Sequence, residues 1–288
     1  MLDRVLAAKL REYGPANAVE QDNVLQELMQ LYVLASLSRA GLFAEAIFHD
    51  GTCLRIVNGI NGFSEDLDFL LKRSDPEFRW QPYLEAVRAD CYGEGIVFEI
   101  QDKTETAMAV RKAFLKTDSM GKLLTLELPF ERYHARKIRI KLEIDTNPPV
   151  GSAFTTNYIT FPVTAPLTTQ TLESGFALKL HALLCRSYVK GRDWYDFIWY
   201  VARKIRPDIV LLEHALEQQG PWAGEELTLT ADWVHEYMAK NIGRIDWDQA
   251  RNDVQRFLPL REQDGLKVWG TDFFLDHLAR LNTAEPTF

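Results

Sequence analysis

The chain has 288 residues, of which 47% are hydrophobic and 26% are charged. This is ordinary globular composition, and it excludes disorder, collagen and a long coiled coil as the class of the whole chain. The formal net charge of −8, taken as a total, argues against a nucleic-acid binder.

The charge is unevenly distributed along the chain. Residues 208–288 hold fifteen acidic and seven basic residues, whereas residues 1–207 hold twenty-six of each. The segment 103–141 has four acidic residues and ten basic ones, namely Lys103, Arg111, Lys112, Lys116, Lys122, Arg132, Arg136, Lys137, Arg139 and Lys141. Such a basic stretch suits an acceptor that carries phosphates, and equally well a solvated face. The total of −8 therefore does not count against an RNA acceptor.

The cysteines and the apolar runs bear on the compartment. Cys53, Cys91 and Cys185 stand far apart without a C-x-x-C pair, which predicts free thiols in a reducing cytosol. No apolar run approaches the length of about 18 residues that a membrane span needs. The first residues carry charges in every turn, unlike a signal peptide. We therefore expect a cytoplasmic protein without a membrane segment.

The expected elements follow the periodicity of the apolar residues. The first forty residues have helical spacing, and a second early helix is expected at 52–58 and a third at 76–92. Strands are expected at 44–49, 65–72, 96–101, 122–128 and 136–145. A mixed segment then runs to Pro166, and later helices are expected at 171–188, 193–205, 208–218, 230–241, 247–257 and 271–282.

This order of elements predicts an α/β (α+β) fold with a mixed half followed by a helical half. The corresponding domains are residues 1–165 and residues 166–288. We find no internal repeat and no long linker between them.

Two aspartates two positions apart are the densest chemical signal. Asp66 and Asp68 fall on the strand expected at 65–72, so their side chains point to the same face. Paired carboxylates of this kind suit a divalent cation with oxygen ligands, which holds the phosphates of a nucleotide. Upstream, Gly51 and Thr52 open a short helix whose free amide groups suit a phosphate. An Asp-x-Asp pair alone is more often a solvated strand face.

A third carboxylate is expected on the strand 136–145. Glu143 and Asp145 lie on the same face of this strand as Lys141, and either of them would complete a metal site. Taken alone, the strand is better explained as an outer sheet face with alternating charges.

A lysine in an apolar helix is the third signal. Lys179 is flanked by apolar residues, and a buried lysine is rare without a partner. A nucleotide phosphate or an aspartate of the following helix would supply that partner. Asp193 and Asp196 stand at the start of that helix, where Asp193 also fits an N-cap and Asp196 a first-turn position.

Four separated motifs together carry a resemblance. They are Gly-Thr-x-Leu-Arg at 51–55, Phe-Ser-Glu-Asp-Leu-Asp-Phe at 63–69, the lysine at 179 and Arg-Asp-x-Tyr-Asp at 192–196. With them the chain resembles the AbiEii family, the nucleotidyltransferase-like toxins of type IV toxin–antitoxin systems. The chain departs from the family's common Gly-Gly-Thr by Asp50. An acid at this turn would repel a triphosphate unless it points away or binds the metal.

The resemblance implies a polymerase-β-like nucleotidyltransferase core with a mixed sheet and a helical C-terminal domain. A nucleoside triphosphate (NTP) and Mg²⁺ or Mn²⁺ would bind in the cleft between them. Asp66 and Asp68 would be catalytic metal ligands, with Asp145 or Glu143 as the third carboxylate. The other implied site residues are Gly51, Thr52 and Ser64 beside the phosphates, Lys179 on the triphosphate oxygens, and Asp193 and Asp196 as the late acidic motif.

The resemblance also implies an activity and partners. A nucleotide would pass from an NTP to an acceptor hydroxyl, such as the 3′ end of a tRNA, and block translation and growth in phage defence. A protein hydroxyl is the alternative acceptor, and a non-catalytic nucleotide- or partner-binding protein is the alternative class. The expected antitoxin is a winged-helix repressor that acts without an obligate stable complex.

Overall fold

The computed structural model describes residues 2–102, 119–128 and 136–283 of the chain. Its strands are β1 (Ala46–His49), β2 (Asp66–Leu71), β3 (Val97–Asp102), β4 (Ser119–Leu128), β5 (Arg136–Asp145), β6 (Phe154–Ile159) and β7 (Ala165–Gln170). Its helices of nine residues or more are α1 (Leu2–Tyr13), α2 (Ala18–Arg39), α3 (Asp50–Asn58), α4 (Gln81–Gly93), α5 (Leu172–Cys185), α6 (Gly191–Ala202), α7 (Ile209–Gln218), α8 (Ala231–Ile242), α9 (Trp247–Gln255) and α11 (Thr271–Ala279). The shorter helices are η1 (Leu42–Ala44), α10 (Leu260–Gln263) and η4 (Asp264–Val268).

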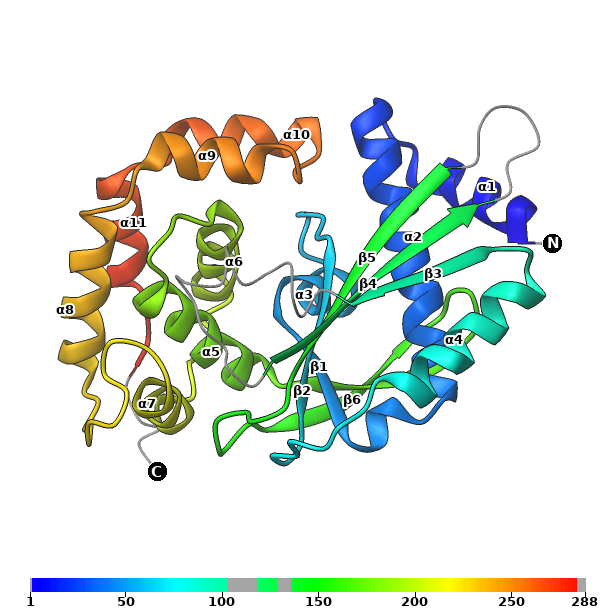
Figure 1. Ribbon diagram of the computed structural model, residues 1–288. Coiled ribbons are helices and arrows are strands. Elements are labelled where there is room, and N and C mark those ends of the chain that lie inside the picture. The colour runs from blue at the N-terminus through cyan, green and yellow to red at the C-terminus, as the bar shows by residue number, and fades with distance from the viewer. Residues whose placement is uncertain (1, 103–118, 129–135, 284–288) are drawn as a thin grey trace.

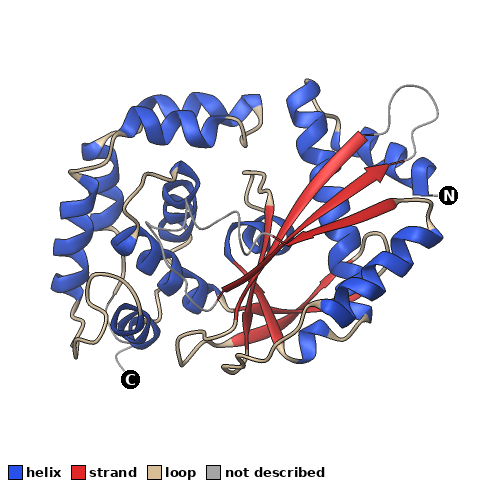
Figure 2. Ribbon diagram, in the orientation of Figure 1, coloured by secondary structure: helices blue, strands red, loops and turns tan. Residues whose placement is uncertain are grey.

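All seven strands form one sheet in the order β3-β4-β5-β2-β1-β7-β6. Strand β2 lies near the centre, antiparallel to β1 and parallel to β5. The sheet is therefore mixed, and Figure 2 shows it on one side of the molecule with most of the later helices on the other. The predicted mixed α/β fold followed by helices is confirmed.

The two faces of β2 have different chemistry because neighbouring side chains alternate. Leu67 and Phe69 are buried together with Leu142 and Ile144, which are their partners on β5. Helix α2 packs against β5 and β7 on this side, and its side chains from Val24 to Leu37 are almost all buried. These side chains belong to the first hydrophobic core. The alternate residues of β2, Asp66 and Asp68, therefore face the helical half.

The helical half has a second hydrophobic core. Trp194 of α6 lies 5.2 Å from Trp247 of α9 and 5.3 Å from Phe274 of α11, measured between ring centroids. Phe176 of α5 stacks on Tyr200 of α6 at 4.5 Å. Large aromatic side chains bury much apolar area, and these contacts join α5 and α6 to each other and to α9 and α11.

Hydrogen bonds join the two halves on both sides of the site. On one side, Gln218 of α7 donates to the carbonyl oxygen of Asn147 at 2.6 Å. On the other, the amide of Phe63 donates to the carbonyl oxygen of Phe257 at 2.8 Å, and the amide of Leu260 donates to Glu20 of α2 at 3.0 Å. Figure 1 shows α9 and α10 reaching across towards α2. The segment after α9 therefore contacts α2 and the loop that precedes β2.

Several predicted elements differ in detail. The expected helix over the first forty residues is two helices, because Gly14 (φ 59°) ends α1 and the side chain of Asn17 caps α2 by accepting from the amide of Glu20. Strands β6 and β7 and helix α10 did not stand out in the sequence. The expected domain boundary between residues 165 and 166 stays a prediction, and the change from strands to helices lies between Gln170 and Leu172.

The cysteines and the helix lengths agree with expectation. Cys53, Cys91 and Cys185 are all free, and the first two are buried. Among the residues that the structure describes, no helix combines the length and the apolar character that crossing a bilayer requires.

Gly191 provides a test of the contact between α6 and α9. A Cβ atom at Gly191 would collide with the carbonyl oxygen of Ala250, and the amide of Gly191 donates to Asp253 of α9 at 2.8 Å. We expect Gly191→Ala to lower the free energy of unfolding by about 1–3 kcal/mol, as overpacking does. Gly265→Ala is the control, because a Cβ atom there meets nothing within 4 Å. Equal urea midpoints for the two variants would contradict the close approach.

Candidate functional site

Three carboxylates of adjacent strands share one face of the sheet. Asp66 and Asp68 alternate with the buried residues of β2, and Glu143 of β5 lies directly opposite Asp68. Paired residues of neighbouring strands point to the same side. The structure therefore brings together Asp66, Asp68 and Glu143, whereas Asp145 lies two pairs further along, opposite Leu70. The expected role of Asp145 as a metal ligand stays a prediction.

The electrostatics of Asp68 favour a cation at this face. Burial, together with the negative charges of Asp50, Asp66 and Glu143, raises the pKa of Asp68 to about 8. Like charges in a desolvated place destabilise one another. A divalent cation with oxygen ligands relieves this repulsion, so the donor set fits Mg²⁺ or Mn²⁺.

The start of α3 lies beside these carboxylates. The hydroxyl of Thr52, which is buried, donates to the carbonyl oxygen of Asp66 and so ties α3 to β2. A Cβ atom at Gly51 would lie 3.6 Å from a carboxylate oxygen of Asp196 and 3.7 Å from the hydroxyl of Ser64. Gly51 and Ser64 are thus neighbours in the site, while the Thr52 hydroxyl has a structural partner. The expected phosphate contacts of all three stay predictions.

Asp50, the first residue of α3, has an unusual backbone conformation. Its φ angle is 61°, in the left-handed region that costs residues other than glycine about 1–2 kcal/mol. Its side chain is 26% exposed and forms an ion pair with the ammonium group of Lys179. The charge of Lys179 outweighs burial, and the pKa of Asp50 is held well below its usual range. This ion pair compensates for the backbone cost at Asp50.

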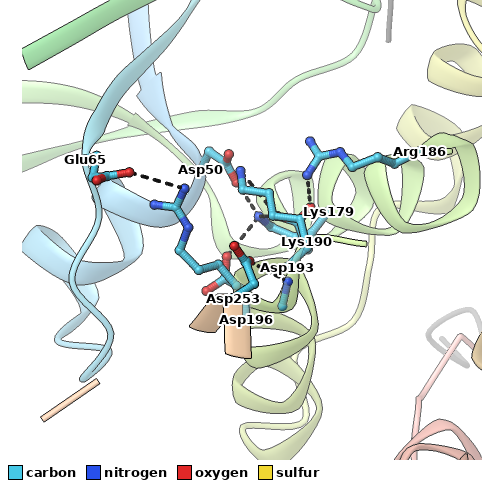
Figure 3. Close-up of polar contacts among 10 residues, drawn as sticks. Asp50, Glu65, Lys179, Arg186, Lys190, Asp193, Asp196 and Asp253 are labelled. Atoms are coloured by element: carbon cyan, nitrogen blue, oxygen red, sulfur yellow. Dashed lines mark hydrogen bonds and ion pairs between the residues drawn. The ribbon is translucent and has the colours of Figure 1, made fainter. Parts of the chain in front are cut away.

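Lys179 lies between carboxylates of two helices (Figure 3). Its Nζ atom is 2.9 Å from Asp193 and 2.9 Å from Asp196 of α6, in addition to its contact with Asp50. The side chain of Lys179 is only 4% exposed. Burial alone would lower its pKa, but the three carboxylates raise it well above the usual value. An aspartate of the following helix, one of the two expected partners, is therefore confirmed.

Among the described residues, the carboxylates around Lys179 are the group whose oxygens lie close enough together to hold one metal ion. Oxygens of Asp50, Asp193 and Asp196 lie within 4.8 Å of one another. The ammonium group of Lys179 contacts all three, so it already supplies the cation that this group needs. Metal binding by Asp66 and Asp68 with a third carboxylate of β5 stays a prediction.

The two aspartates of α6 have opposite electrostatic environments. Burial raises the pKa of Asp193, but Lys179, Lys190 and Arg186 outweigh it and lower that pKa to about 2. For Asp196, burial prevails over Lys179 and raises the pKa to about 6. The expectation that Asp193 is an N-cap was wrong, because α6 begins at Gly191 and Asp193 lies within its first turn.

Two cations of the site, Lys190 and Arg192, were given no role from the sequence, although Arg192 opens the motif at 192–196. Lys190 lies 3.8 Å from Asp193, and Arg192 lies 3.9 Å from Glu65, the residue before Asp66. The guanidinium of Arg192 stacks over the ring of Phe257 at 4.2 Å. The sequence signal was the pair of basic residues around Gly191, directly before the helix. Both cations face the small cavity described next.

Two adjoining cavities occupy the cleft. The small cavity, about 20 Å³, is lined by Gly51, Ser64, Asp66 and Asp68 on the sheet side and by Lys190, Arg192, Asp193 and Asp196 on the helical side. The large cavity, about 300 Å³, lies over the ends of β1, β2 and β5 and below α5 and α7. Asp50 and Lys179 line both cavities, so their ion pair is the wall between them.

The basic stretch 103–141 lies mostly outside the part of the chain that the structure describes. Lys103, Arg111, Lys112, Lys116 and Arg132 fall outside the described residues, and the side chains of Lys122, Arg136 and Lys137 are likewise not described. Within the described part, Arg139 is exposed, and Lys141 lies 2.7 Å from Glu143. The expectation of an RNA-binding stretch stays a prediction.

Removing the charge of Lys179 tests its position among the carboxylates. We expect Lys179→Met to lower the free energy of unfolding at pH 7 by about 3–5 kcal/mol, because buried carboxylates lose their partner. In the wild type, the lowered pKa values of Asp50 and Asp193 stabilise the fold above the unfolded-state pKa of about 4. The difference between the proteins should therefore be fully present above about pH 4 and shrink as the pH falls from about 4 towards about 2.

Lys240→Met is the matched control for this experiment. Lys240 is 48% exposed, pairs with Glu236 one turn away and lies 4.5 Å above the ring of Tyr237. Such surface pairs contribute little to stability, so this variant should unfold like the wild type in urea titrations from pH 2 to 8. A pH-independent loss in Lys179→Met would contradict the electrostatic role of Lys179.

Comparisons with known proteins identify the family of the chain. No curated protein matches the chain. Two solved structures are similar over most of their length: a Helicobacter pylori protein to which nucleotidyltransferase activity is ascribed (16% identity, 89% of this chain and 96% of that one, TM-score 0.48) and H. pylori JHP933 (16%, 87% and 85%, TM-score 0.46). The family model for the nucleotidyl transferase AbiEii toxin of type IV toxin–antitoxin systems matches residues 32–277. The chain therefore belongs to the AbiEii family of nucleotidyltransferase toxins.

Proposed function

We propose that the protein transfers a nucleotide from an NTP to an acceptor hydroxyl, with the 3′ end of a tRNA as the acceptor. The observation that carries the proposal is the register of β2 and β5, which sets Asp66, Asp68 and Glu143 on one face beside the start of α3. We assign the binding of a divalent cation to these three carboxylates. The helical half supplies Lys190 and Arg192 on the opposite side of the small cavity.

The charges lining the small cavity support a metal-bound nucleotide as the substrate. Five aspartates (Asp50, Asp66, Asp68, Asp193 and Asp196) line it together with three cations (Lys179, Lys190 and Arg192). The excess of negative charge disfavours a bare triphosphate. A divalent cation supplies the missing positive charge and offsets the charge that develops on the phosphates during transfer.

The chain's own residues would divide the work of the reaction. The amide end of α3 at Gly51, together with Ser64, Lys190 and Arg192, contacts phosphate oxygens. The acceptor oxygen attacks the α-phosphorus, the bond between the α- and β-phosphates breaks, and pyrophosphate leaves. The proton of the acceptor hydroxyl passes to a carboxylate of the Asp66, Asp68 and Glu143 group. Positioning and charge stabilisation provide most of the rate in such reactions.

Lys179 needs a change of partner to contact a phosphate. An ammonium group has three N–H donors, and the three carboxylates around Lys179 satisfy them. Asp50 is the most exposed of the three carboxylates, at 26% against 3% for Asp193 and 7% for Asp196. We infer that Lys179 orients the aspartates of α6 in the substrate-free protein and that a phosphate competes with Asp50 for its third donor.

The wider role follows from the family. A type IV toxin implies an antitoxin, and we propose a winged-helix repressor that opposes the toxin without a stable complex. Modification of tRNA would block translation and growth during phage defence in the cytoplasm. A protein hydroxyl as the acceptor remains the alternative enzyme function.

Transfer activity tests the proposal. Purified protein is incubated with Mg²⁺, each α-labelled NTP, total tRNA and cell lysate. We expect label in tRNA, and a loss of about 10²-fold or more in Asp66→Ala and in Glu143→Gln. Asp145→Asn is the matched control and should retain activity within a few-fold.

The outcomes separate the competing functions. Label only in protein would refute the tRNA acceptor, and equal losses in Asp145→Asn and Glu143→Gln would refute the assignment of the third carboxylate. Asp66→Ala is also expressed in cells without the antitoxin. Growth inhibition that survives this substitution would refute a catalytic toxin and support the non-catalytic alternative.

Asp50 provides a separate prediction. Asp50→Gly removes both the competing carboxylate and the left-handed backbone cost, so we expect Mg²⁺-tripolyphosphate to bind several-fold more tightly than in the wild type. Isothermal titration calorimetry measures this change. Asp264→Gly is the control, because Asp264 belongs to an exposed ion pair with Lys267. Asp253 is not used, because it accepts a hydrogen bond from the amide of Gly191 at the start of α6. Weaker binding in Asp50→Gly would show that Asp50 assists the ligand.

A further inference from the structure

Helix α2 carries polar side chains that take no part in the proposed chemistry. Its residues from Val24 to Leu37 are almost all buried, and among them Gln30 is only 1% exposed. Gln26 lies one turn before Gln30, so the two amides share a face of the helix. A buried amide costs free energy unless it is hydrogen-bonded, so the acceptors of these amides show which segment this face of α2 holds.

Gln30 holds the segment that leads into β2. Its Nε2 atom donates to the carbonyl oxygen of Ser64 at 3.0 Å. Residues 59–65 lie between α3 and β2 and belong to neither a helix nor a strand, so their carbonyl oxygens need partners outside a regular ladder. Ser64 also lines the small cavity. The amide of Gln30 therefore fixes the backbone at a residue of the site.

Gln26 joins the same segment to β5. Its Nε2 atom donates to the carbonyl oxygen of Arg139 at 2.7 Å and, over a longer distance of 3.4 Å, to that of Glu65. A side-chain amide nitrogen has two N–H donors, so one group can serve both acceptors. Arg139 lies on β5, and Glu65 directly precedes β2. Gln26 therefore ties together the two strands that carry Asp66 and Glu143.

Asp66 depends on this support more than Asp68 does. Within the described sheet, Asp68 has a partner on β1 and another on β5, whereas Asp66 pairs with Lys141 of β5 and has no partner on β1. The hydroxyl of Thr52 holds the carbonyl oxygen of Asp66 from α3, and the amides of α2 hold the two residues before it. A shift of this segment would therefore move Ser64 and Asp66 and leave Asp68 in place.

We propose that Gln26 and Gln30 are positioning residues, which set Ser64 and Asp66 for a metal-bound nucleotide through hydrogen bonds to the backbone. This inference rests on the proposed function, which assigns the binding of a cation to Asp66. Both glutamines precede the matched residues 32–277, so membership of the family assigns them no role. They act through the main chain of the segment before β2 and are not themselves ligands.

Replacing Gln30 tests this assignment. Gln30→Leu removes the donor, so the segment before β2 loses a fixed point. The full chain is titrated with Mn²⁺ by calorimetry, and nucleotide transfer is measured at saturating Mg²⁺. We expect Mn²⁺ to bind about tenfold more weakly, as happens on loss of other residues that orient metal ligands. The kcat of transfer should fall about tenfold, while the KM for the NTP should change less than about twofold, because the lost interaction acts in the transition state.

Val33→Ala is the control for destabilisation alone. Val33 is a fully buried residue of the same helix, and its truncation leaves a cavity in the first core while keeping both amides. It should lower the urea midpoint and leave Mn²⁺ affinity, kcat and KM unchanged at temperatures where it is folded. Gln26→Leu, at a half-buried position, covers the case in which Gln30→Leu does not fold, and it should weaken Mn²⁺ binding and lower kcat in the same way.

The outcomes distinguish this inference from the proposed function. Mn²⁺ affinity and kcat equal to those of Val33→Ala in the folded glutamine variants would overturn the positioning role while leaving the proposed function standing. A rise in KM with an unchanged kcat would overturn it as well. Absence of Mn²⁺ binding and of transfer in the wild type would instead overturn both.

Discussion

The ammonium group of Lys179 is the point on which the arrangement of the site depends. It is buried, and it joins Asp50 at the start of α3 to Asp193 and Asp196 on α6. Without this cation, three carboxylates would face one another in a desolvated cleft, which is strongly unfavourable. The lysine therefore holds the sheet half and the helical half at a fixed separation, and both cavities take their shape from that separation.

The same geometry separates the carboxylates of the site into those that are paired with cations and those of the sheet that are not fully neutralised. Asp50 and Asp193 are compensated by Lys179 and Lys190, whereas on the sheet Glu143 pairs with Lys141 and Asp68 is only partly offset by Lys190. Burial and the neighbouring charges raise the pKa of Asp68 as a result. The uncompensated charge is thus on the sheet, next to the amide end of α3, where a metal-bound phosphate would meet both.

Local patterns in the sequence were sufficient for some features and not for others. The shared face of Asp66 and Asp68 follows from the period of a strand and needs no information from elsewhere. The choice between Glu143 and Asp145 depends on the register of β5 against β2, which a single sequence does not fix across more than 70 intervening residues. The partner of Lys179 was narrowed to a phosphate or an aspartate of the next helix, but Asp50 lies 129 positions away. Strands β6 and β7 are short and rich in threonine, so their alternation gives little signal.

The two hydrophobic cores give the site a particular vulnerability. Asp66 and Asp68 stand on a strand that is hydrogen-bonded along both edges and anchored in the first core, while Lys179, Asp193 and Asp196 stand on helices anchored in the second. Separate cores commonly behave as separate cooperative units that open with different free energies. Local unfolding of the helical unit alone would carry the lysine away from intact strand carboxylates. Activity would then be lost at the unfolding of the less stable core, and its dependence on temperature would report the stability of that core.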